Sequence, residues 1–184
     1  MFEAQTEWIA PDNFPDLSGY KLISIDLETR DPDLKSKGSG AVIGNGEIIG
    51  VAVAVDGWCK YYPFGHEGGG NLDKKRILSW LTDVCATEAT KIFHNAMYDV
   101  CWLRSYGIKV NGHIMDTMVM ASLVDENRMR YTLNALSWEY LGERKSEATL
   151  FEIAKNWGID PKAELYKLPA IYVGEYAEKD ASLT

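Results

Sequence analysis

Cysteine and histidine are scarce in this chain of 184 residues, which contains three of each. Cys59, Cys85 and Cys101 are scattered and odd in number, so they match neither a disulfide framework nor a zinc-binding spacing. The three histidines show no paired metal-ligand spacing either. The sequence thus excludes a disulfide-stapled secreted domain and a structural zinc module, and it is typical of a reducing compartment.

Long apolar runs are also absent. No stretch approaches the ~20 residues that a membrane-spanning helix needs, and the N-terminal residues lack the basic-then-apolar order of a secretory signal. We therefore expect no contact with a membrane, a cytoplasmic location and a monomer.

Positive charge is in short supply. Nineteen lysines and arginines stand against 27 aspartates and glutamates, which leaves a net charge of −8. Proteins that hold a nucleic-acid backbone over many phosphates are usually basic. An acidic chain can still bind the end of a nucleic-acid strand in two ways. Divalent cations can lie between its carboxylates and the phosphates, or a neighbouring domain can supply the affinity for nucleic acid.

The patterns that are present predict one α/β domain. Residues 21–27 are apolar and rich in β-formers, which predicts a buried strand. Residues 47–55 and 58–64 are predicted to form a hairpin around Asp56-Gly57. The glycine- and charge-rich residues 30–46 are predicted to form a loop.

The rest of the chain is predicted to be mainly helical, with one further strand at residues 91–94. Helical spacing and helix-end signals predict helices at 73–85, 96–106, 116–123, 132–141 and 149–157, and a last helix from Pro169 into the C-terminus. The expected fold is a mixed five-stranded sheet with helices on both faces.

Asp26 and Glu28 lie at the end of the first strand. Residues i and i+2 of a strand point to the same face, so the two carboxylates project together while Leu27 turns to the core. Adjacent like charges call for a bound cation or a raised pKa. A solvated strand edge is the alternative interpretation of this pair.

Two further motifs place a polar residue and an acid at i and i+4, on one face of a helix. Asn95 and Asp99 follow a short strand and open a helix, where an acid also favours the helix dipole. Tyr176 and Asp180 lie on the last helix, where a packing tyrosine and a surface charge are the alternative.

In chain order, these three motifs resemble the DEDD exonucleases, in the branch that has tyrosine in its last motif. The chain looks like the proofreading domain of family A DNA polymerases, particularly of bacteriophage type. The resemblance covers about residues 20–184 and rests on residues 25–29, 61–71, 94–99, 115–124, 133–142 and 176–180. It implies a ribonuclease-H-like fold and a single exonuclease domain, residues 1–184, that forms the N-terminal part of a longer polymerase.

The resemblance also implies a catalytic site with two metal ions. Asp26 would bridge the two ions, Glu28 and Asp180 would hold the one that activates water, and Asp99 would hold the other through water. Tyr176 would orient the attacking hydroxide. Four carboxylates match the preference of Mg²⁺ or Mn²⁺ for oxygen ligands.

Substrate contacts are implied for five residues. Asn95 and Tyr98 match positions that touch the terminal nucleotides, and the backbone of Thr29 would meet the 3′ hydroxyl. Leu150 or Phe151 would wedge between the last bases. A structural role in the core is the alternative for these contacts.

The implied activity is removal of nucleoside 5′-monophosphates from the 3′ end of single-stranded DNA, as proofreading for a polymerase domain in the parent chain. The gene would be viral and the protein would act in the host cytoplasm. Two alternatives remain: an RNA 3′→5′ exonuclease, which only treatment of the 2′-hydroxyl would distinguish, and an inactive exonuclease-like binding module. Asp116 is expected to be a helix cap or a support for the site rather than a metal ligand.

Overall fold

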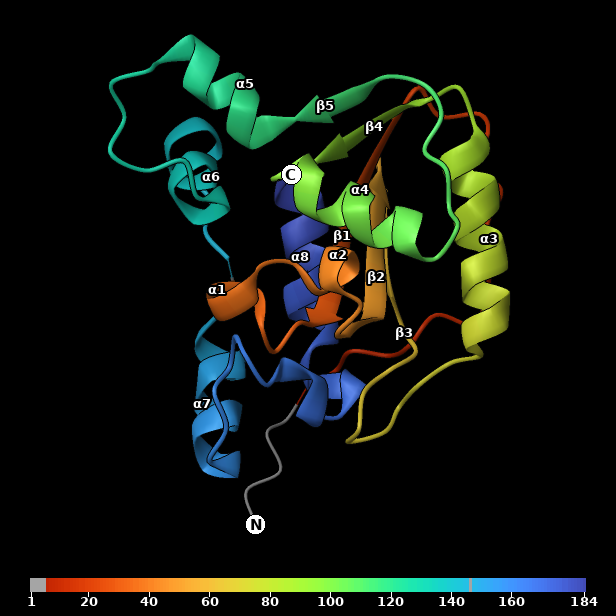
Figure 1. The fold of residues 1–184 in the computed structure, drawn as a ribbon, viewed down its shortest axis with the longest axis vertical. Coiled ribbons are helices and arrows are strands. Elements are labelled where there is room, and N and C mark those ends of the chain that lie inside the picture. The colour runs from red at the N-terminus through yellow and green to blue at the C-terminus, as the bar shows by residue number, and fades with distance from the viewer. Residues whose placement is uncertain (1–5, 146) are drawn as a thin grey trace.

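The computed structural model describes residues 6–145 and 147–184. Its centre is a five-stranded sheet in the order β3-β2-β1-β4-β5 (Figure 1). β1 pairs antiparallel with β2, which pairs antiparallel with β3, whereas β4 and β5 continue the sheet in parallel. The strands are β1 (Leu22–Arg30), β2 (Glu47–Val55), β3 (Trp58–Pro63), β4 (Thr90–Phe93) and β5 (Ile114–Asp116). The mixed five-stranded sheet expected from the sequence is confirmed.

Helices fill most of the connections between strands and the C-terminal part of the chain. Among the described residues, none is both long and apolar enough to cross a bilayer. The α-helices are α1 (Leu34–Lys37), α2 (Gly40–Ile43), α3 (Lys74–Ala86), α4 (Ala96–Ser105), α5 (Thr117–Val124), α6 (Leu133–Leu141), α7 (Ala148–Trp157) and α8 (Gly174–Leu183), and the short 3₁₀ helices are η1 (Leu165–Lys167) and η2 (Ala170–Tyr172).

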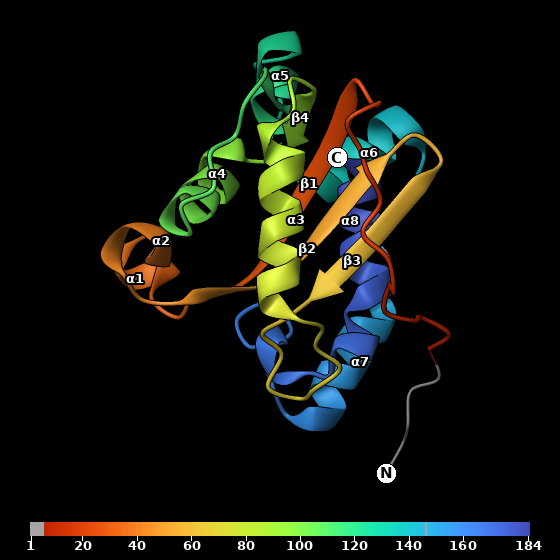
Figure 2. The same cartoon turned by 90° about the vertical axis from the view of Figure 1, so that its right-hand side faces the viewer.

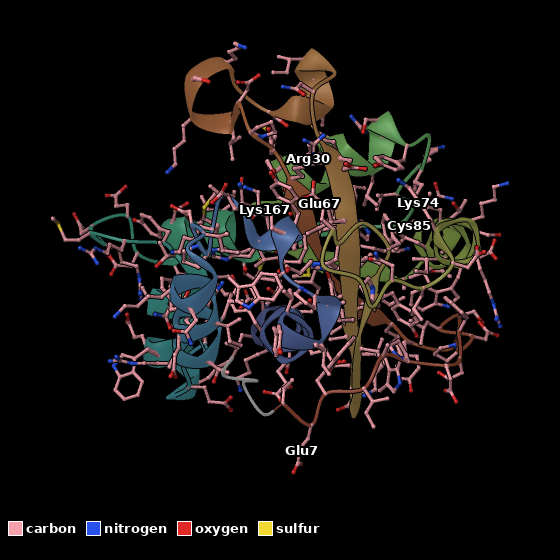
Figure 3. The ribbon with its side chains drawn as sticks, turned by 90° about the horizontal axis from the view of Figure 1, so that it is seen from below. Glu7, Arg30, Glu67, Lys74, Cys85 and Lys167 are labelled. Carbon is pink, nitrogen blue, oxygen red and sulfur yellow. The ribbon has the colours of Figure 1, made fainter. Side chains whose placement is uncertain are left out.

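The sheet separates two hydrophobic cores. Ile23, Ile25 and Leu27 of β1 alternate onto the face that packs against α3 and α4. The other face, which carries Ala52 and Tyr61, packs against α7 and α8. Figures 2 and 3 show α3 and α8 on opposite sides of the sheet. Because side chains alternate along a strand, the residues of β1 between the apolar ones face α8.

Three predicted boundaries were wrong. The region 30–46 contains α1 and α2 rather than loop alone, and the Asp31 carboxylate accepts a hydrogen bond from Gly40 N at the start of α2. β1 continues to Arg30 because β2 pairs with it along that length. The last helix begins at Gly174, not at Pro169, because a 3₁₀ turn intervenes in which Val173 N bonds to Ala170 O.

Candidate active site

The open edge of β1 is where the acidic residues gather. β1 pairs with β4 only as far as Ser24 opposite Ile92, but it continues to Arg30 paired with β2 alone. Asp26 and Glu28 lie on this extension and on the face toward α8. The backbone on the β4 side of the extension is free to receive contacts from neighbouring elements.

Small residues on β2 make room beside the two carboxylates. Ala52 is paired with Asp26, and Gly50 is paired with Glu28. A Cβ on Gly50 would lie 2.1 Å from the Tyr61 hydroxyl, so this oxygen fills the space beside Glu28. The register shifts between Glu28 and the next residue, which leaves a β-bulge of the kind often found next to active sites.

Asp99 reaches the open edge from α4, on the other side of the sheet. Its Oδ1 accepts a hydrogen bond of 3.2 Å from Leu27 N, and only 5% of the residue is exposed. Asn95, just before α4, has a φ of 73°, a conformation that is rare outside glycine. The Asp116 carboxylate holds this turn, because it accepts hydrogen bonds from Asn95 N (3.0 Å) and Ala96 N (2.8 Å).

Asp116 also caps the helix that follows it. Its Oδ1 accepts hydrogen bonds from Met118 N at 2.9 Å and Val119 N at 3.3 Å, at the start of α5. Asp116 therefore serves two helix starts at once, which confirms its predicted role as a cap and explains how the start of α4 is held. His94 is also hydrogen-bonded, with Nδ1 2.9 Å from Thr117 Oγ1.

α8 brings Tyr176 and Asp180 to the same place from the opposite face. Ser24 Oγ donates a hydrogen bond of 2.7 Å to Ala181 O, which holds the end of α8 against β1. Asp180 is 4% exposed. Asp26, Glu28, Asp99, Asp180 and Tyr176, which were separated by as many as 154 positions in the sequence, therefore meet around one end of β1.

Lys145 is a member of the site that the sequence did not reveal. It lies between α6 and α7, and its Nζ donates to Asp180 Oδ2. Its backbone N–H donates to Asn134 Oδ1 at 3.3 Å, and its Nζ lies 5.3 Å from the centre of the Tyr176 ring. A lone lysine in a polar linker has no motif. The one feature of the sequence that could have suggested a basic residue in the site is the presence of four acids, which need a compensating positive charge.

The acids influence one another strongly. Burial raises the pKa of Asp26 to about 7, assisted by the charge of Asp180 and opposed by Lys145. Burial, then the charge of Asp26, raises the pKa values of Glu28 and Asp99 well above their usual range. Burial also raises the pKa of Asp180, again opposed by Lys145. Neighbouring acids that cannot all be ionised together call for a cation.

The donor set is compatible with hard divalent cations. All four acids offer carboxylate oxygens, which Mg²⁺ and Mn²⁺ prefer. Within the described ranges, Asp180 Oδ1 is buried and has no hydrogen-bond partner, so it is available to a ligand. In the same ranges, no three histidine, cysteine, aspartate or glutamate side chains are placed so that they could hold a metal ion as they stand. A bound ion would therefore have to draw the carboxylates together.

A cleft of about 450 Å³ lies beside Glu28 and is lined in part by Thr29, Asn95 and Tyr98. The Tyr98 hydroxyl donates to Asp31 Oδ2 at 3.0 Å and lies 2.7 Å from Thr29 Oγ1. Because the carboxylate only accepts, the Thr29 hydroxyl is the donor to Tyr98. The three candidate contact residues from β1 and α4 thus share one cleft next to the acids.

The two candidate wedge residues on α7 differ in position. Leu150 is 2% exposed and belongs to the core beneath α8, so its placement disfavours contact with a base. Phe151 is 40% exposed, and the Nζ of Lys162 lies 5.9 Å from the centre of its ring. Of the two, Phe151 is better placed to contact a base, and a role for either residue stays a prediction.

A mixed five-stranded sheet with acids converging from β1, α4 and α8 is compatible with a metal-dependent nuclease. The chain belongs to the 3′-5′ exonuclease family of family A DNA polymerases, whose model matches residues 4–184. It is 36% identical over 185 residues to a DNA-directed DNA polymerase of Pseudomonas phage M6, an alignment that covers 97% of this chain and 28% of the relative. It is 29% identical over 180 residues to DNA polymerase DpoZ of Salmonella phage PMBT28, covering 92% of this chain and 26% of the relative.

The chain thus spans little more than a quarter of the length of these phage relatives. Among solved structures, it is similar to Brucella melitensis NrnC with bound Mg²⁺, with a TM-score of 0.58 and 19% identity. That match covers 92% of this chain and 69% of NrnC. At this level of identity the similarity supports the fold.

Proposed function

We propose that this chain is a metal-dependent 3′→5′ exonuclease that hydrolyses the 3′ ends of single-stranded DNA to nucleoside 5′-monophosphates. The observation that carries the proposal is the meeting of Asp26, Glu28, Asp99 and Asp180 at the free end of β1, with mutually raised pKa values. Membership of the exonuclease family supports it.

Each acid has a distinct part in the proposed chemistry. Two Mg²⁺ or Mn²⁺ ions, when bound, would supply an activated water and neutralise charge on the attacked phosphate. Asp26 would hold both ions, Glu28 and Asp180 one of them, and Asp99 the other. Tyr176 shares a helix face with Asp180, so its hydroxyl would orient the attacking water. Burial raises the pKa of Tyr176, which keeps its proton in place for hydrogen bonding.

The cleft beside Glu28 is the proposed seat of the terminal nucleotide. Thr29 would contact the 3′ hydroxyl through its backbone, and Asn95 would offer a side chain that is not used to cap α4. The Tyr98 ring would contact the terminal base, with its hydroxyl held by Thr29 and Asp31. Phe151, on the far side, would separate the last two bases by stacking.

We further propose that the biological role is proofreading within a longer phage-encoded polymerase, in the cytoplasm of the host. The phage relatives are called DNA polymerases, and the aligned region covers only 28% and 26% of their lengths. A mispaired 3′ end frays more readily than a paired one, so it would be presented to this cleft as a single strand.

The test is a time course on a 5′-labelled single-stranded DNA and on an RNA of the same sequence, with Mg²⁺ or with chelator. The expected result is a ladder that shortens from the 3′ end, faster on DNA, and that disappears with chelator. Asp26→Ala should abolish it. Asp83→Ala, which removes an exposed acid on α3, is the matched control and should leave the ladder unchanged.

Other outcomes would change the assignment. Faster loss of the RNA would make the chain an RNA exonuclease. Absence of cleavage of either strand, with folded protein and Mg²⁺ present, would contradict the proposal and favour an inactive binding module.

A further inference from the structure

Lys145 occupies a position in the acid cluster that the proposed chemistry leaves without a role. Its Nζ contacts Asp180 Oδ2, and the two side chains are 15% and 5% exposed. The backbone hydrogen bond to Asn134 and the Tyr176 ring hold the lysine from two other sides. The ammonium is thus directed at the carboxylate and not into solvent.

Among the described residues, Lys145 is the one basic side chain that forms an ion pair with a proposed metal ligand. Of the ion pairs made by the described residues, none except Lys145–Asp180 includes any of the four proposed metal ligands. Lys145 also opposes the rise of the pKa values of Asp26, Glu28 and Asp180. One ammonium therefore acts electrostatically on several of these acids.

We propose that Lys145 competes with the divalent cation for Asp180: its ammonium stands in for the metal in the metal-free protein, and metal binding displaces it. The inference rests on the proposed function, because it takes Asp180 as a metal ligand. The physical reason is that an ammonium and a dication bound to one carboxylate in a buried site repel each other.

Two consequences follow. Without metal, Lys145 compensates a buried carboxylate that would otherwise be unpaired, so removal of its charge destabilises the metal-free protein. With metal at Asp180, the ammonium and the dication repel each other, so removal of the lysine charge strengthens metal binding. A lysine that only supported the fold would not produce the second effect.

The test measures Mn²⁺ binding to the full chain by isothermal titration calorimetry, for wild type and Lys145→Met. Methionine keeps most of the apolar stem and removes the charge. The Kd for Mn²⁺ should fall about tenfold, as expected for loss of a competing charge-assisted hydrogen bond. In parallel, the Tm should fall without metal and recover most of this loss at saturating Mn²⁺.

Two variants serve as controls. Lys179→Met removes the same charge from the residue next to Asp180, but Lys179 pairs with Glu143, so its Mn²⁺ affinity should equal that of wild type. Lys145→Arg keeps the charge and should keep the weaker affinity. If Lys145→Met does not fold, Lys145→Gln replaces it, because its amide retains hydrogen-bond donors without the charge.

The outcomes separate this inference from the proposed function. Equal Mn²⁺ affinity for wild type and Lys145→Met would overturn the competition and leave the metal site intact. Weaker binding by Lys145→Met would also overturn it and make the lysine a support of the metal-loaded state. Failure of wild type, Lys145→Met and Asp26→Asn alike to bind Mn²⁺ would overturn the proposed metal site and, with it, this inference.

Discussion

Two lysines of this protein are withdrawn from water, and their surroundings differ. Lys91 is 0% exposed at the start of β4. Its Nζ donates to Thr87 O, to Thr87 Oγ1 (2.9 Å), to Ala89 O (3.0 Å) and to Asn111 O (3.1 Å). These acceptors are neutral, and they come from the segments on both sides of β4.

Lys145 is held instead by one carboxylate. That carboxylate, on Asp180, keeps a second oxygen buried and without a partner in the described part of the chain. Lys91 replaces its lost hydration by several neutral oxygens, so nothing in its surroundings calls for another cation. Lys145 sits in an acid cluster whose negative charge exceeds its own. Lys91 and its neutral acceptors therefore stabilise the fold, and we call this group the brace. The contact of Lys145 with Asp180 is instead one that a metal ion could replace.

The largest expected effect breaks the acid cluster. Asp26→Asn should lower nuclease activity by about 10³-fold or more, because the variant removes a charge proposed to bind both ions. The metal-free Tm should not fall, since the change removes one of several repelling carboxyl groups. Single-turnover cleavage and calorimetric unfolding check this. Loss of stability with retained activity would contradict the assignment of this region to function.

The reverse pattern is expected at the brace. Lys91→Met should reduce the free energy of unfolding by about 3 kcal/mol, because it leaves buried carbonyl oxygens without a donor. Activity per folded molecule should remain within about twofold of wild type, because none of the acceptors of Lys91 belongs to the acid cluster. Urea unfolding gives the first quantity, and activity at a temperature where the variant is folded gives the second. If activity fell much more than the unfolded fraction of the variant explains, Lys91 would contribute to catalysis as well as to stability.

A pH series should sharpen the contrast. The pKa of Asp26 is raised to about 7 in the folded protein, above its usual value of 3.8. The folded state therefore holds more protons than the unfolded state between about pH 4 and pH 7, and stability declines as pH rises through this window. The limiting slope is about 1.4 kcal/mol per pH unit for one such group.

Thermal unfolding of the metal-free protein from pH 4 to pH 8 measures this decline. Asp26→Asn should make the slope shallower, and saturating Mn²⁺ should flatten it further, because bound cations favour ionised carboxylates. A metal-free protein that becomes more stable from pH 4 to pH 7 would show that the acids are not mutually destabilising.

The smallest change in stability is expected for a lysine that is neither buried among neutral acceptors, like Lys91, nor paired within the acid cluster, like Lys145. Lys179→Met breaks an exposed pair with Glu143 and should change the free energy of unfolding by less than about 0.5 kcal/mol. Urea unfolding beside Lys91→Met and Lys145→Met provides the scale for the other two lysines. If Lys179→Met reduced the free energy of unfolding as much as Lys91→Met does, burial of the lysine contacts would not explain the difference between these residues.

Much of the fold was accessible from local patterns. Alternation and the Asp56-Gly57 turn predicted the hairpin of β2 and β3, and helix-end signals predicted α3, α4, α6 and α7 to within a few residues. The short strand β5 was not identified individually, because three residues carry too little periodicity. Its place in the sheet comes from pairing with β4, which is a non-local contact.

The sequence predicted some residues of the candidate site and not others. Asp26, Glu28, Asp99, Tyr176 and Asp180 belong to motifs with regular spacing, and the structure brings them together; their catalytic roles remain proposals. Lys145, the burial of Leu150 and the double cap by Asp116 depend on side chains from distant segments. A single sequence contains no spacing rule for such contacts.

The sequence by itself determined which residues share a face, because the periods of strand and helix are local properties of the backbone. It therefore placed Asp26 beside Glu28 and Tyr176 beside Asp180. Only the tertiary structure decided that β4 ends early enough to free the edge of β1, that Asp99 bonds to that edge, and that Lys145 meets Asp180. These contacts arise from the packing of elements far apart in the chain, whose burial sets the charge balance of the site.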